Sequence, residues 1–416
     1  MSGKTIYVYA DWLGHPPQLM GILYAEDSRG EETYSFAYDD HWLSCQEAQC
    51  PLDPDLSLYA GRQYVPVNKS MFGVFSDSCP DRWGRLLMMR REQFLAREEG
   101  RKPRTLRESD YLLGVHDEAR MGAIRFRLEP EGAFLSCESD MAAPPWTTLR
   151  ELEAASNAFE HDGSGNERKW LRQLLAPGSS LGGARPKASV RHPDGSLWIA
   201  KFPSRNDETD IGAWEMVCHE LARYCRIRMP EATLLRFSDR GSTFLTRRFD
   251  RNGMERIHFA SAMTMLGRKD GDHDASYLDI VDFLTAYGSR PKEDLRELWR
   301  RIVFSMAVSN TDDHLRNHGF LMTDKGWRLS PAYDLNPTPE GALLSLNVDG
   351  SESIIDFDIV RDAAPYYETS RAEADRYISE TAEFIRNNWR LIARRHHIPS
   401  ADQERMAPAF GACETI

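Results

Sequence analysis

The spacing of the hydrophobic residues changes partway along this chain of 416 residues. Up to about residue 265, short apolar runs are separated by Gly, Pro and Asp, which is typical of β-strands joined by turns. From about Ser276 onwards, apolar residues recur three and four positions apart, as on one face of a helix. A strand-rich part followed by a helical part predicts an α+β fold of two lobes.

The strongest helix signal lies at residues 293–308, where Leu295, Leu298, Ile302 and Met306 keep helical spacing. Ser276 and Asp279 form a Ser-x-x-Asp pattern typical of a capping box at a helix start. The sequence also predicts helices at residues 81–98, 148–162, 211–227 and 374–396.

Strand-like segments occupy residues 5–12, 19–26, 33–38 and 119–130. Two hairpins are expected at residues 188–204 and 232–251, turning at Pro193-Asp194-Gly195 and Asp239-Arg240-Gly241. The segment 137–148, with paired prolines and small residues, is a candidate linker.

The composition narrows the class of protein. A formal charge of −12 argues against a surface that binds nucleic acid or anionic membranes as a whole. The start of the chain lacks a signal-peptide pattern, and no apolar run reaches the ~18 residues that span a bilayer, so we expect a cytoplasmic protein without a membrane partner. The seven cysteines are scattered and never form a C-x-x-C pair, which favours neither a zinc site nor a disulfide framework.

The first chemical motif is the stretch "GSSLGGARPK", residues 178–187. Gly182 and Gly183 allow a close approach of the backbone to a ligand and suit a phosphate, but the stretch matches neither standard phosphate-loop pattern, and taken alone it favours a plain surface loop. Lys201 follows in the strand-like stretch "LWIAKFP". It is either an edge lysine that extends to solvent or a cation for phosphate, oriented by Glu215 or Glu220.

The second motif follows the helix at residues 293–308 and reads "SNTDDHLRNHGF". Asp312 and Asn317 have the spacing of the kinase catalytic loop D-x-x-x-x-N, in which the Asp orients the substrate hydroxyl and the Asn oxygen ligates magnesium. Asp334, in "WRLSPAYDLNP", is either a turn residue or a second magnesium carboxylate. The order of these motifs along the chain favours a phosphotransferase.

Five stretches of the chain resemble the motifs of the HipA family, the serine/threonine kinase toxins of bacterial toxin–antitoxin modules. They are "SSLGGARPK", "WIAKFPS", "TRRFDR", "NTDDHLRN" and "LSPAYDLNP". Looser similarity at "VYADWLGHPPQLMGILYAEDSRGEETYSFAYDDHWL" and "VFSDSCPDRWGRLL" extends the likeness to about residues 6–395.

The resemblance implies a two-lobed protein-kinase-like fold that binds ATP and Mg²⁺. Asp312 would be the catalytic aspartate, and Asn317 and Asp334 would ligate magnesium. The nucleotide would contact further residues, and a loop serine would be autophosphorylated to switch the kinase off. The nucleotide residues are Gly182, Gly183, Ala184, Arg185, Pro186, Lys187, Lys201, Arg247, Arg248, Phe249, His314 and Asn317, and the phosphosite is Ser180, with Ser179 as second choice.

Two positions depart from the kinase pattern. Thr311 stands where H-R-D kinases have Arg, which puts control through an activation-loop phosphate in doubt. Arg247 stands where an acidic or neutral hinge residue is expected, but hinges bind adenine through their backbone.

The likeness also implies a division into domains. Residues 1–140 would form a HipA-like N-terminal α/β domain, residues 146–265 the kinase small lobe, and residues 266–416 the helical C-terminal lobe. The implied partners are a protein substrate, such as an aminoacyl-tRNA synthetase or another translation component, and a small helix-turn-helix antitoxin of the HipB type. DNA would be contacted only through this antitoxin.

Two alternatives stay open at this point. The chain could be a non-catalytic corepressor bound to an antitoxin, with the basic stretch around Arg101, Lys102 and Arg104 touching DNA, or that stretch could be a solvated helix and loop. It could also be a kinase of a small molecule, since a fold does not define its acceptor.

Overall fold

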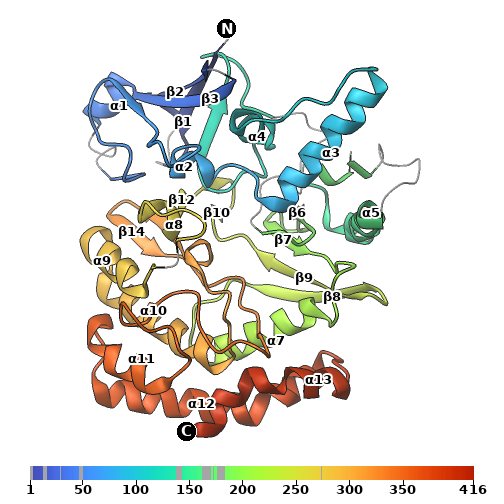
Figure 1. Cartoon of the computed structure of the whole chain (residues 1–416), viewed down its shortest axis with the longest axis vertical. Helices are drawn as coiled ribbons and strands as arrows, with labels where there is room; N and C mark the ends of the chain where they lie inside the picture. Colours follow the sequence, from blue (N-terminus) through green and yellow to red (C-terminus); the bar gives the residue numbers. More distant parts are fainter. Residues whose placement is uncertain are drawn as a thin grey trace. The chain divides into compact units, whose positions relative to one another are not determined.

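The computed structural model describes the chain except residues 1–2, 13–15, 29, 46–49, 137–142, 162–169, 172, 176–182 and 273. Internal contacts group it into two units, residues 1–205 with 247–260 and residues 206–246 with 261–416. They are called the first and second unit, and each is described by itself (Figure 1).

The first unit contains a five-stranded antiparallel sheet in the order β4-β3-β2-β1-β5. Alternate residues of its strands, such as Ile6, Val8 and Phe36, are fully buried, as expected for a sheet with one apolar face. The strands are β1 (Lys4–Ala10), β2 (Gln18–Ser28), β3 (Glu31–Tyr38), β4 (Arg62–Tyr64) and β5 (Ile124–Arg127).

The rest of the first unit consists of short helices and two hairpins. The hairpin of β6 (Lys187–Arg191) and β7 (Leu197–Lys201) turns at Pro193-Asp194-Gly195, and Gly195 has the positive φ of +86° that the turn requires. The other elements are α1 (Asp40–Ser44), α2 (Gly73–Ser76), α3 (Arg82–Glu98), α4 (Glu108–Gly114), η3 (Trp146–Thr148), α5 (Leu149–His161), β10 (Arg251–Asn252) and β11 (Glu255–Arg256).

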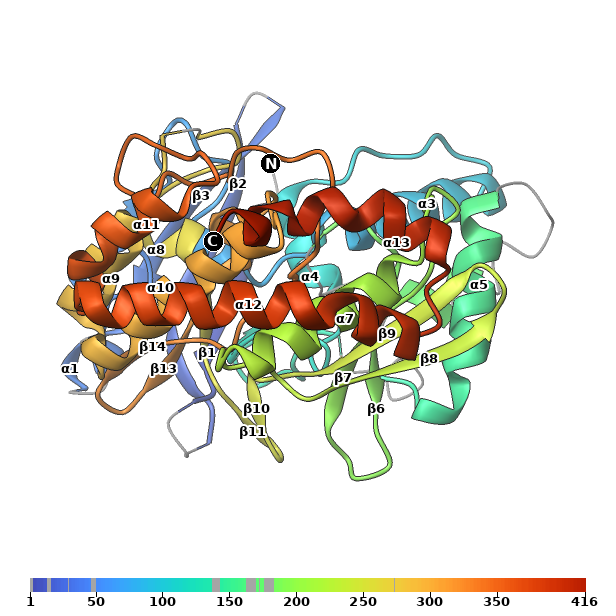
Figure 2. The same cartoon turned by 90° about the horizontal axis from the view of Figure 1, so that it is seen from below.

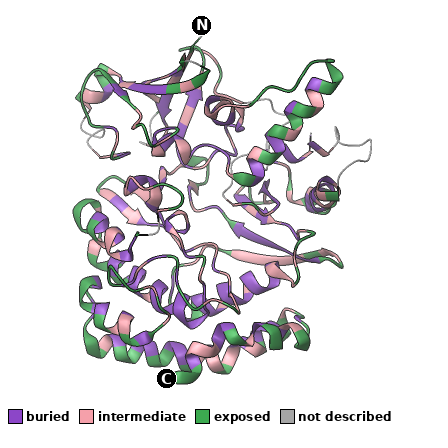
Figure 3. Cartoon of the chain, in the orientation of Figure 1, coloured by how far each residue is buried: buried purple, intermediate pink, exposed green. Residues whose placement is uncertain are grey.

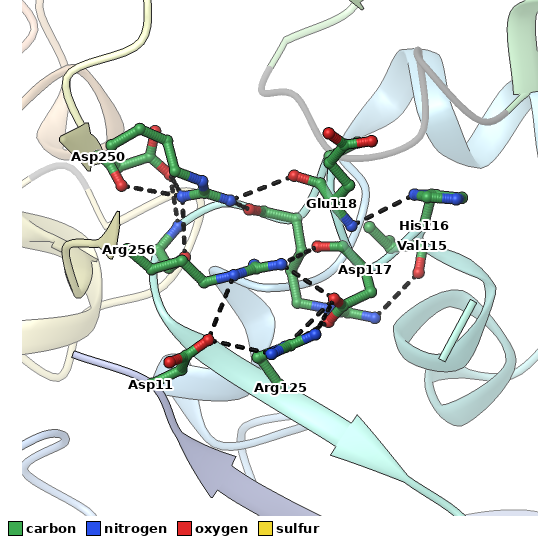
Figure 4. Close-up of polar contacts among 12 residues, drawn as sticks. Asp11, Val115, His116, Asp117, Glu118, Arg125, Asp250 and Arg256 are labelled. Atoms are coloured by element: carbon green, nitrogen blue, oxygen red, sulfur yellow. Dashed lines mark hydrogen bonds and ion pairs between the residues drawn. The ribbon is translucent and has the colours of Figure 1, made fainter. Parts of the chain in front are cut away.

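A buried arginine–aspartate cluster holds the β10–β11 hairpin within the first unit (Figure 4). Arg248 and Arg251 both bind the Asp250 carboxylate, with nitrogen–oxygen distances of 2.6 Å, and the Gly122 N–H donates to the same carboxylate at 2.8 Å. Burial by itself would raise the pKa of Asp250, but the two guanidiniums hold that pKa well below its usual range. Asp250 therefore stays ionised inside the unit.

The same cluster continues to the edge of the five-stranded sheet. Arg125, on β5, and Arg256, on β11, both bind Asp117, at 2.6 and 2.9 Å. Arg125 also binds Asp11, which follows β1, at 3.1 Å. These ion pairs connect the hairpin with strands β1 and β5.

The second unit is mainly helical, and its longest helices pack through apolar stripes. The buried side chains of α10 (Pro291–Ala307) include the four stripe residues that the sequence predicts, and α12 (Arg371–Arg395) buries a stripe that includes Ile378, Ile385 and Ile392. Trp389 of α12 stacks on Phe410 with ring centroids 4.4 Å apart, and Trp299 of α10 lies 5.5 Å from the Tyr377 ring. Figure 2 shows α12 running alongside α10 and α7, and Figure 3 shows buried and exposed residues along it.

The remaining elements of the second unit surround this packing. Ser276 and Asp279 form the predicted capping box at the start of α9. The elements are α7 (Ile211–Tyr224), β8 (Ala232–Ser238), β9 (Gly241–Arg247), α8 (Ala262–Met265), α9 (Tyr277–Tyr287), η4 (Leu315–Asn317), β13 (Gly319–Thr323), β14 (Gly326–Leu329), α11 (Phe357–Ala363), η5 (Ala364–Tyr367), α13 (Ser400–Met406) and η6 (Ala407–Thr415), with β12 (Phe259–Ser261) where the chain enters this unit.

The predicted α+β class is confirmed, and so are the predicted helices and hairpins, to within a few residues at their ends. Short elements such as α4 and β13 were not predicted, because they contain too few residues to show a hydrophobic periodicity. Six residues of the expected linker, 137–142, lie outside the described residues. In the described part of the chain, no helix has the length and apolar character needed to cross a membrane.

Candidate active site

The loop that follows α10 is shaped by its backbone rather than by a glycine cap. The chain leaves the helix through Ser309, which has a left-handed φ of +48°. The Asn310 N–H then donates to the Ser305 carbonyl at 2.8 Å, and the buried Asn310 side chain donates to the Ser305 hydroxyl at 3.3 Å. This turn fixes the direction in which the next residues leave the helix.

Asp313 is a buried structural residue of this loop. Its carboxylate accepts hydrogen bonds from the Tyr277 hydroxyl at 2.6 Å and the Ser305 hydroxyl at 3.3 Å, and it pairs with His318 Nε2 at 3.0 Å. Burial opposes its charge, but His318 and these hydroxyls hold the pKa of Asp313 below its ordinary value. Asp313 thus anchors the loop to α9 and α10.

Asp312, its neighbour, lies in the opposite environment. Its side chain is 83% exposed, and the imidazole nitrogen His314 Nε2 lies 3.8 Å from its Oδ1. The Asp312 carbonyl accepts a hydrogen bond from the Asn317 side-chain nitrogen at 2.8 Å. Because the backbone of Asp312 is held while its carboxylate faces solvent, this group can meet a ligand without breaking internal bonds.

Asn317 has its side-chain amide oriented by the same contact. The Nδ2 atom is used by the Asp312 carbonyl, so the remaining polar atom, Oδ1, is an oxygen acceptor. The predicted partners Asp312 and Asn317 are therefore brought together, through a backbone carbonyl rather than through their functional oxygens.

Asp334 lies on a segment that is bonded to the same loop. The Asn336 N–H donates to the Asn310 side-chain oxygen at 3.3 Å, and the Tyr333 hydroxyl donates to the Arg316 carbonyl at 2.7 Å. Asp334 itself has a left-handed φ of +59°. These contacts bring the segment carrying Asp334 to the loop carrying Asn317, within one unit.

The donor atoms at this place suit a magnesium ion. Asn336 donates through Nδ2 to an Asp334 carboxylate oxygen at 3.3 Å, which orients its amide, and its Oδ1 is buried without a hydrogen-bond partner in the described part of the chain. A buried oxygen without a donor calls for a water molecule or a cation. Carboxylate and amide oxygens are the protein ligands that magnesium prefers. Among the described residues, no group of three His, Cys, Asp or Glu side chains is placed to hold a metal ion, and this place combines one carboxylate with asparagine oxygens.

Two lysines face each other in the first unit. Lys187 of β6 and Lys201 of β7 are directly opposite in the antiparallel register, so both side chains lie on one face of the hairpin. The nitrogen of Lys187 lies 2.8 Å from where a Cβ on Gly183 would be, and Gly183 has a φ of +85°. The positive φ thus favours glycine at 183, whereas the close atom is the end of a flexible lysine side chain, which can move aside.

Other candidates of the glycine-rich stretch are only partly covered. Ser179, Ser180 and Gly182 lie outside the described residues. Ala184 is exposed, Arg185 is half-buried, and the Pro186 carbonyl accepts the Phe202 N–H at 2.9 Å.

Arg248, expected near adenine, has a structural side chain. It is 3% exposed, binds Asp250, and donates to the Ala119 and Arg120 carbonyls at 2.6 and 3.0 Å. Its N–H donates to the Leu197 carbonyl at 2.9 Å. Because the side chain and the N–H of Arg248 are both used in internal bonds, its carbonyl oxygen is the group that could contact a ligand. Its neighbours Arg247 and Phe249 are exposed and half-buried.

Glu215 and Glu220, the two carboxylates considered as partners of Lys201, differ in their surroundings. Glu220 binds His396 Nε2 at 2.7 Å and Arg395 at 3.1 Å, at the end of α12. Glu215 is buried within α7. Glu220 is therefore committed to a contact between helices of the second unit.

The basic stretch near residue 101 is paired with carboxylates. Arg101 binds Glu92 and Glu99, both at 2.5 Å, and Arg104 binds Asp110 at 2.8 Å. These pairs match the expectation of a solvated helix and loop.

Comparisons with known proteins agree with this picture. Residues 179–389 match the family described as HipA-like C-terminal domain. The structure resembles HipA of Shewanella oneidensis, solved with HipB and operator DNA, with a TM-score of 0.68, 17% identity and coverage of 98% of this chain and 97% of that chain. At this identity, the likeness establishes the fold.

Two curated proteins are also similar. "Putative kinase Y4dM" of Sinorhizobium fredii is 26% identical over 209 residues, 47% of this chain and 49% of that protein. "Putative kinase" of Haemophilus influenzae is 25% identical over 188 residues, 39% of this chain and 54% of that protein. The alignments thus extend over only about half the length of these relatives.

Proposed function

The chain belongs to the HipA-like C-terminal domain family, and we propose that it is an ATP-dependent protein kinase of the HipA type. The observation that carries this proposal is the contrast between neighbouring aspartates. The Asp313 carboxylate is buried and bound by neighbouring side chains, whereas the Asp312 carboxylate is exposed. The Asn317 amide is oriented by its hydrogen bond to the Asp312 carbonyl. This is the arrangement that a D-x-x-x-x-N catalytic loop needs.

In the proposed reaction, the Asp312 carboxylate accepts the hydrogen bond of a serine or threonine hydroxyl and orients its oxygen toward the γ-phosphorus of ATP. Asn317 and Asp334 supply oxygens to Mg²⁺, which when bound would neutralise charge on the phosphates. The residues of 182–187 and Lys201 contact the phosphates, and His314 lies beside the nucleotide. The segment 247–249 contacts the adenine.

Regulation and partners are also part of this proposal. Ser180, or Ser179 as second choice, is the site of autophosphorylation. The added charge of about −2 would repel the phosphates of ATP. The partner is a small helix-turn-helix antitoxin of the HipB type, which alone contacts DNA, and the target is a translation component such as an aminoacyl-tRNA synthetase. The solved HipA, which was crystallised with HipB and operator DNA, supports this choice of partner.

The experiment is phosphate transfer by the purified chain in Mg²⁺ and labelled ATP. We expect label on Ser180 or Ser179, its loss in Asp312→Asn, and no transfer when EDTA removes the magnesium. Unlabelled protein under conditions where nucleotide binds would overturn the kinase proposal. Phosphoproteomics after induction separates a protein acceptor from a small-molecule acceptor, because only the former yields new phosphoserine or phosphothreonine on other proteins.

The corepressor alternative is less favoured by the contacts of its basic stretch. Arg101 and Arg104 are bound by carboxylates, so contact with DNA phosphates would first require these pairs to break. Operator binding by the chain alone that weakens in Arg101→Ala would revive the alternative.

A further inference from the structure

The first turn of α3 makes three contacts with the end of the glycine-rich stretch, about 100 residues later in the chain. One Asp81 carboxylate oxygen accepts the Gly183 N–H at 2.5 Å, and the Trp83 N–H donates to the Gly183 carbonyl at 3.2 Å. The Trp83 indole N–H donates to the Lys187 carbonyl at 3.0 Å. All of these residues belong to the first unit, and Figure 1 shows the start of α3 near β6.

These contacts hold both ends of the described segment 183–187. Gly183 is bonded on both sides of its residue, through its N–H and its carbonyl, in a conformation that only glycine adopts readily. Lys187 is held by its carbonyl, and its ammonium lies close beneath Gly183. The backbone of Lys187, opposite Lys201 in the hairpin, is therefore held by a residue of α3.

Asp81 has two separable tasks. Its Oδ1 accepts the Arg82 N–H at 2.7 Å and caps α3, while its Oδ2 accepts the Gly183 N–H. Trp83 is 2% exposed and packs edge-on against Phe159 of α5, at 5.5 Å between ring centroids, so its indole has a fixed direction. The Asp81 carboxylate has two acceptor oxygens, one for the cap and one for Gly183, whereas an asparagine amide has a single acceptor oxygen.

We propose that Asp81 and Trp83 are positioning residues for the nucleotide-binding segment, outside the kinase motifs. The inference rests on the proposed use of residues 182–187 and Lys201 for ATP. By fixing the Gly183 peptide and the start of β6, α3 pre-organises the cations for the phosphates, so that binding does not have to order them.

The test compares Asp81→Asn with Asp39→Asn. Asparagine remains a good N-cap, so Asp81→Asn should keep α3 while losing the acceptor for Gly183. Asp39 caps α1 by accepting the His41 N–H at 3.0 Å, so the control removes the same charge from another cap. The affinity for a non-hydrolysable ATP analogue with Mg²⁺, measured by calorimetry, should fall about five- to tenfold in Asp81→Asn and stay unchanged in Asp39→Asn.

Hydrogen exchange provides a readout without nucleotide. In the free protein, the Gly183 amide should exchange faster in Asp81→Asn than in the wild type or in Asp39→Asn. Unchanged exchange would show that the hydrogen bond from the Gly183 N–H to Asp81, called the tether, is not formed. Faster exchange with unchanged affinity would show that the tether does not position the nucleotide-binding segment. Tighter nucleotide binding would mean that the Asp81 carboxylate competes with the phosphates, which also overturns the proposal.

A second variant covers the case in which Asp81→Asn does not fold. Trp83→Phe keeps an aromatic ring for Phe159 but removes the donor to the Lys187 carbonyl, and should weaken the analogue about threefold. If the wild-type chain binds no nucleotide at all, the proposed function fails, while the exchange of the Gly183 amide still reports whether the tether exists.

Discussion

The arginine–aspartate cluster of the first unit and the loop after α10 in the second unit use the same residue type for opposite purposes. In the cluster, Asp117 and Asp250 are buried and each is bound by two guanidiniums. In the loop, Asp313 is buried and is bound by the His318 imidazole and two hydroxyls, while its neighbour Asp312 faces solvent. The difference separates carboxylates that hold the fold from the carboxylate that is available for chemistry.

Replacement of Asp312 tests most directly whether the exposed carboxylate serves chemistry rather than stability. Asp312→Asn should lower the rate of phosphate transfer by about 10²–10⁴-fold, because the group that orients the acceptor hydroxyl is lost. The free energy of unfolding should change by less than about 0.5 kcal/mol, since the side chain is exposed. Kinetics with labelled ATP and urea unfolding measure the two effects. A larger change in the free energy of unfolding would show that Asp312 stabilises the fold instead.

Asp250→Ala should produce the largest loss of stability. It leaves Arg248 and Arg251 buried without their carboxylate, which costs about 3–5 kcal/mol. The matched control is Glu26→Gln, which breaks the exposed pair with Arg62 and should cost about 0–1 kcal/mol. Urea unfolding followed by tryptophan fluorescence compares them. Equal losses in both variants would contradict the structural role of the cluster.

Asp313→Asn should have an intermediate effect on stability. Tyr277 and Ser305 keep an acceptor, but the pairing with His318 weakens, so we expect a cost of about 1–3 kcal/mol. Its measurement alongside Asp312→Asn tests the division between the neighbours directly. A stable Asp313→Asn protein with full loss of transfer would reverse their assignments.

The smallest expected effect is on pH dependence. The pKa of Asp250 is lower in the folded chain than its ordinary 3.8, so its stabilisation is fully present above that pH and is lost as the pH falls through the folded value. Each such group contributes at most about 1.4 kcal/mol per pH unit. Acid unfolding of the wild type should therefore be steeper than that of Asp250→Ala. Parallel acid slopes would show that Asp250 is not held ionised.

The helices with a long apolar stripe could be predicted from the sequence, and so could the closeness of Asp312 and Asn317, whose catalytic role stays a prediction. The stripe on α10 and the offset between Asp312 and Asn317 lie within one short stretch, so their geometry follows from local backbone rules. The assignment of Asn317 and Asp334 to magnesium stays a prediction, as do the nucleotide residues and the domain boundaries.

Contacts between distant stretches could not be predicted. Arg248 looks like a hinge residue in "TRRFDR", but its surroundings are made by the Ala119 and Arg120 carbonyls, more than 120 positions earlier. Asp81 shows no signal toward Gly183, because a cap residue before a helix is explained by the helix alone. Asn336 follows Asp334 closely in the sequence, but only the structure shows that its side-chain oxygen is buried and has no hydrogen-bond donor among the described residues.

The left-handed backbone of Asp334 limits how this position can vary during evolution. At a φ of +59°, Gly and Asn fit with little strain, whereas Ala, Val, Tyr or Glu would fit poorly. Asp codons reach Asn and Gly by single-base changes, and both replacements remove the carboxylate while preserving the backbone. A lineage that drifts at position 334 would therefore tend to keep its fold and lose this charge, and under the proposed function it would also lose a ligand of the magnesium ion.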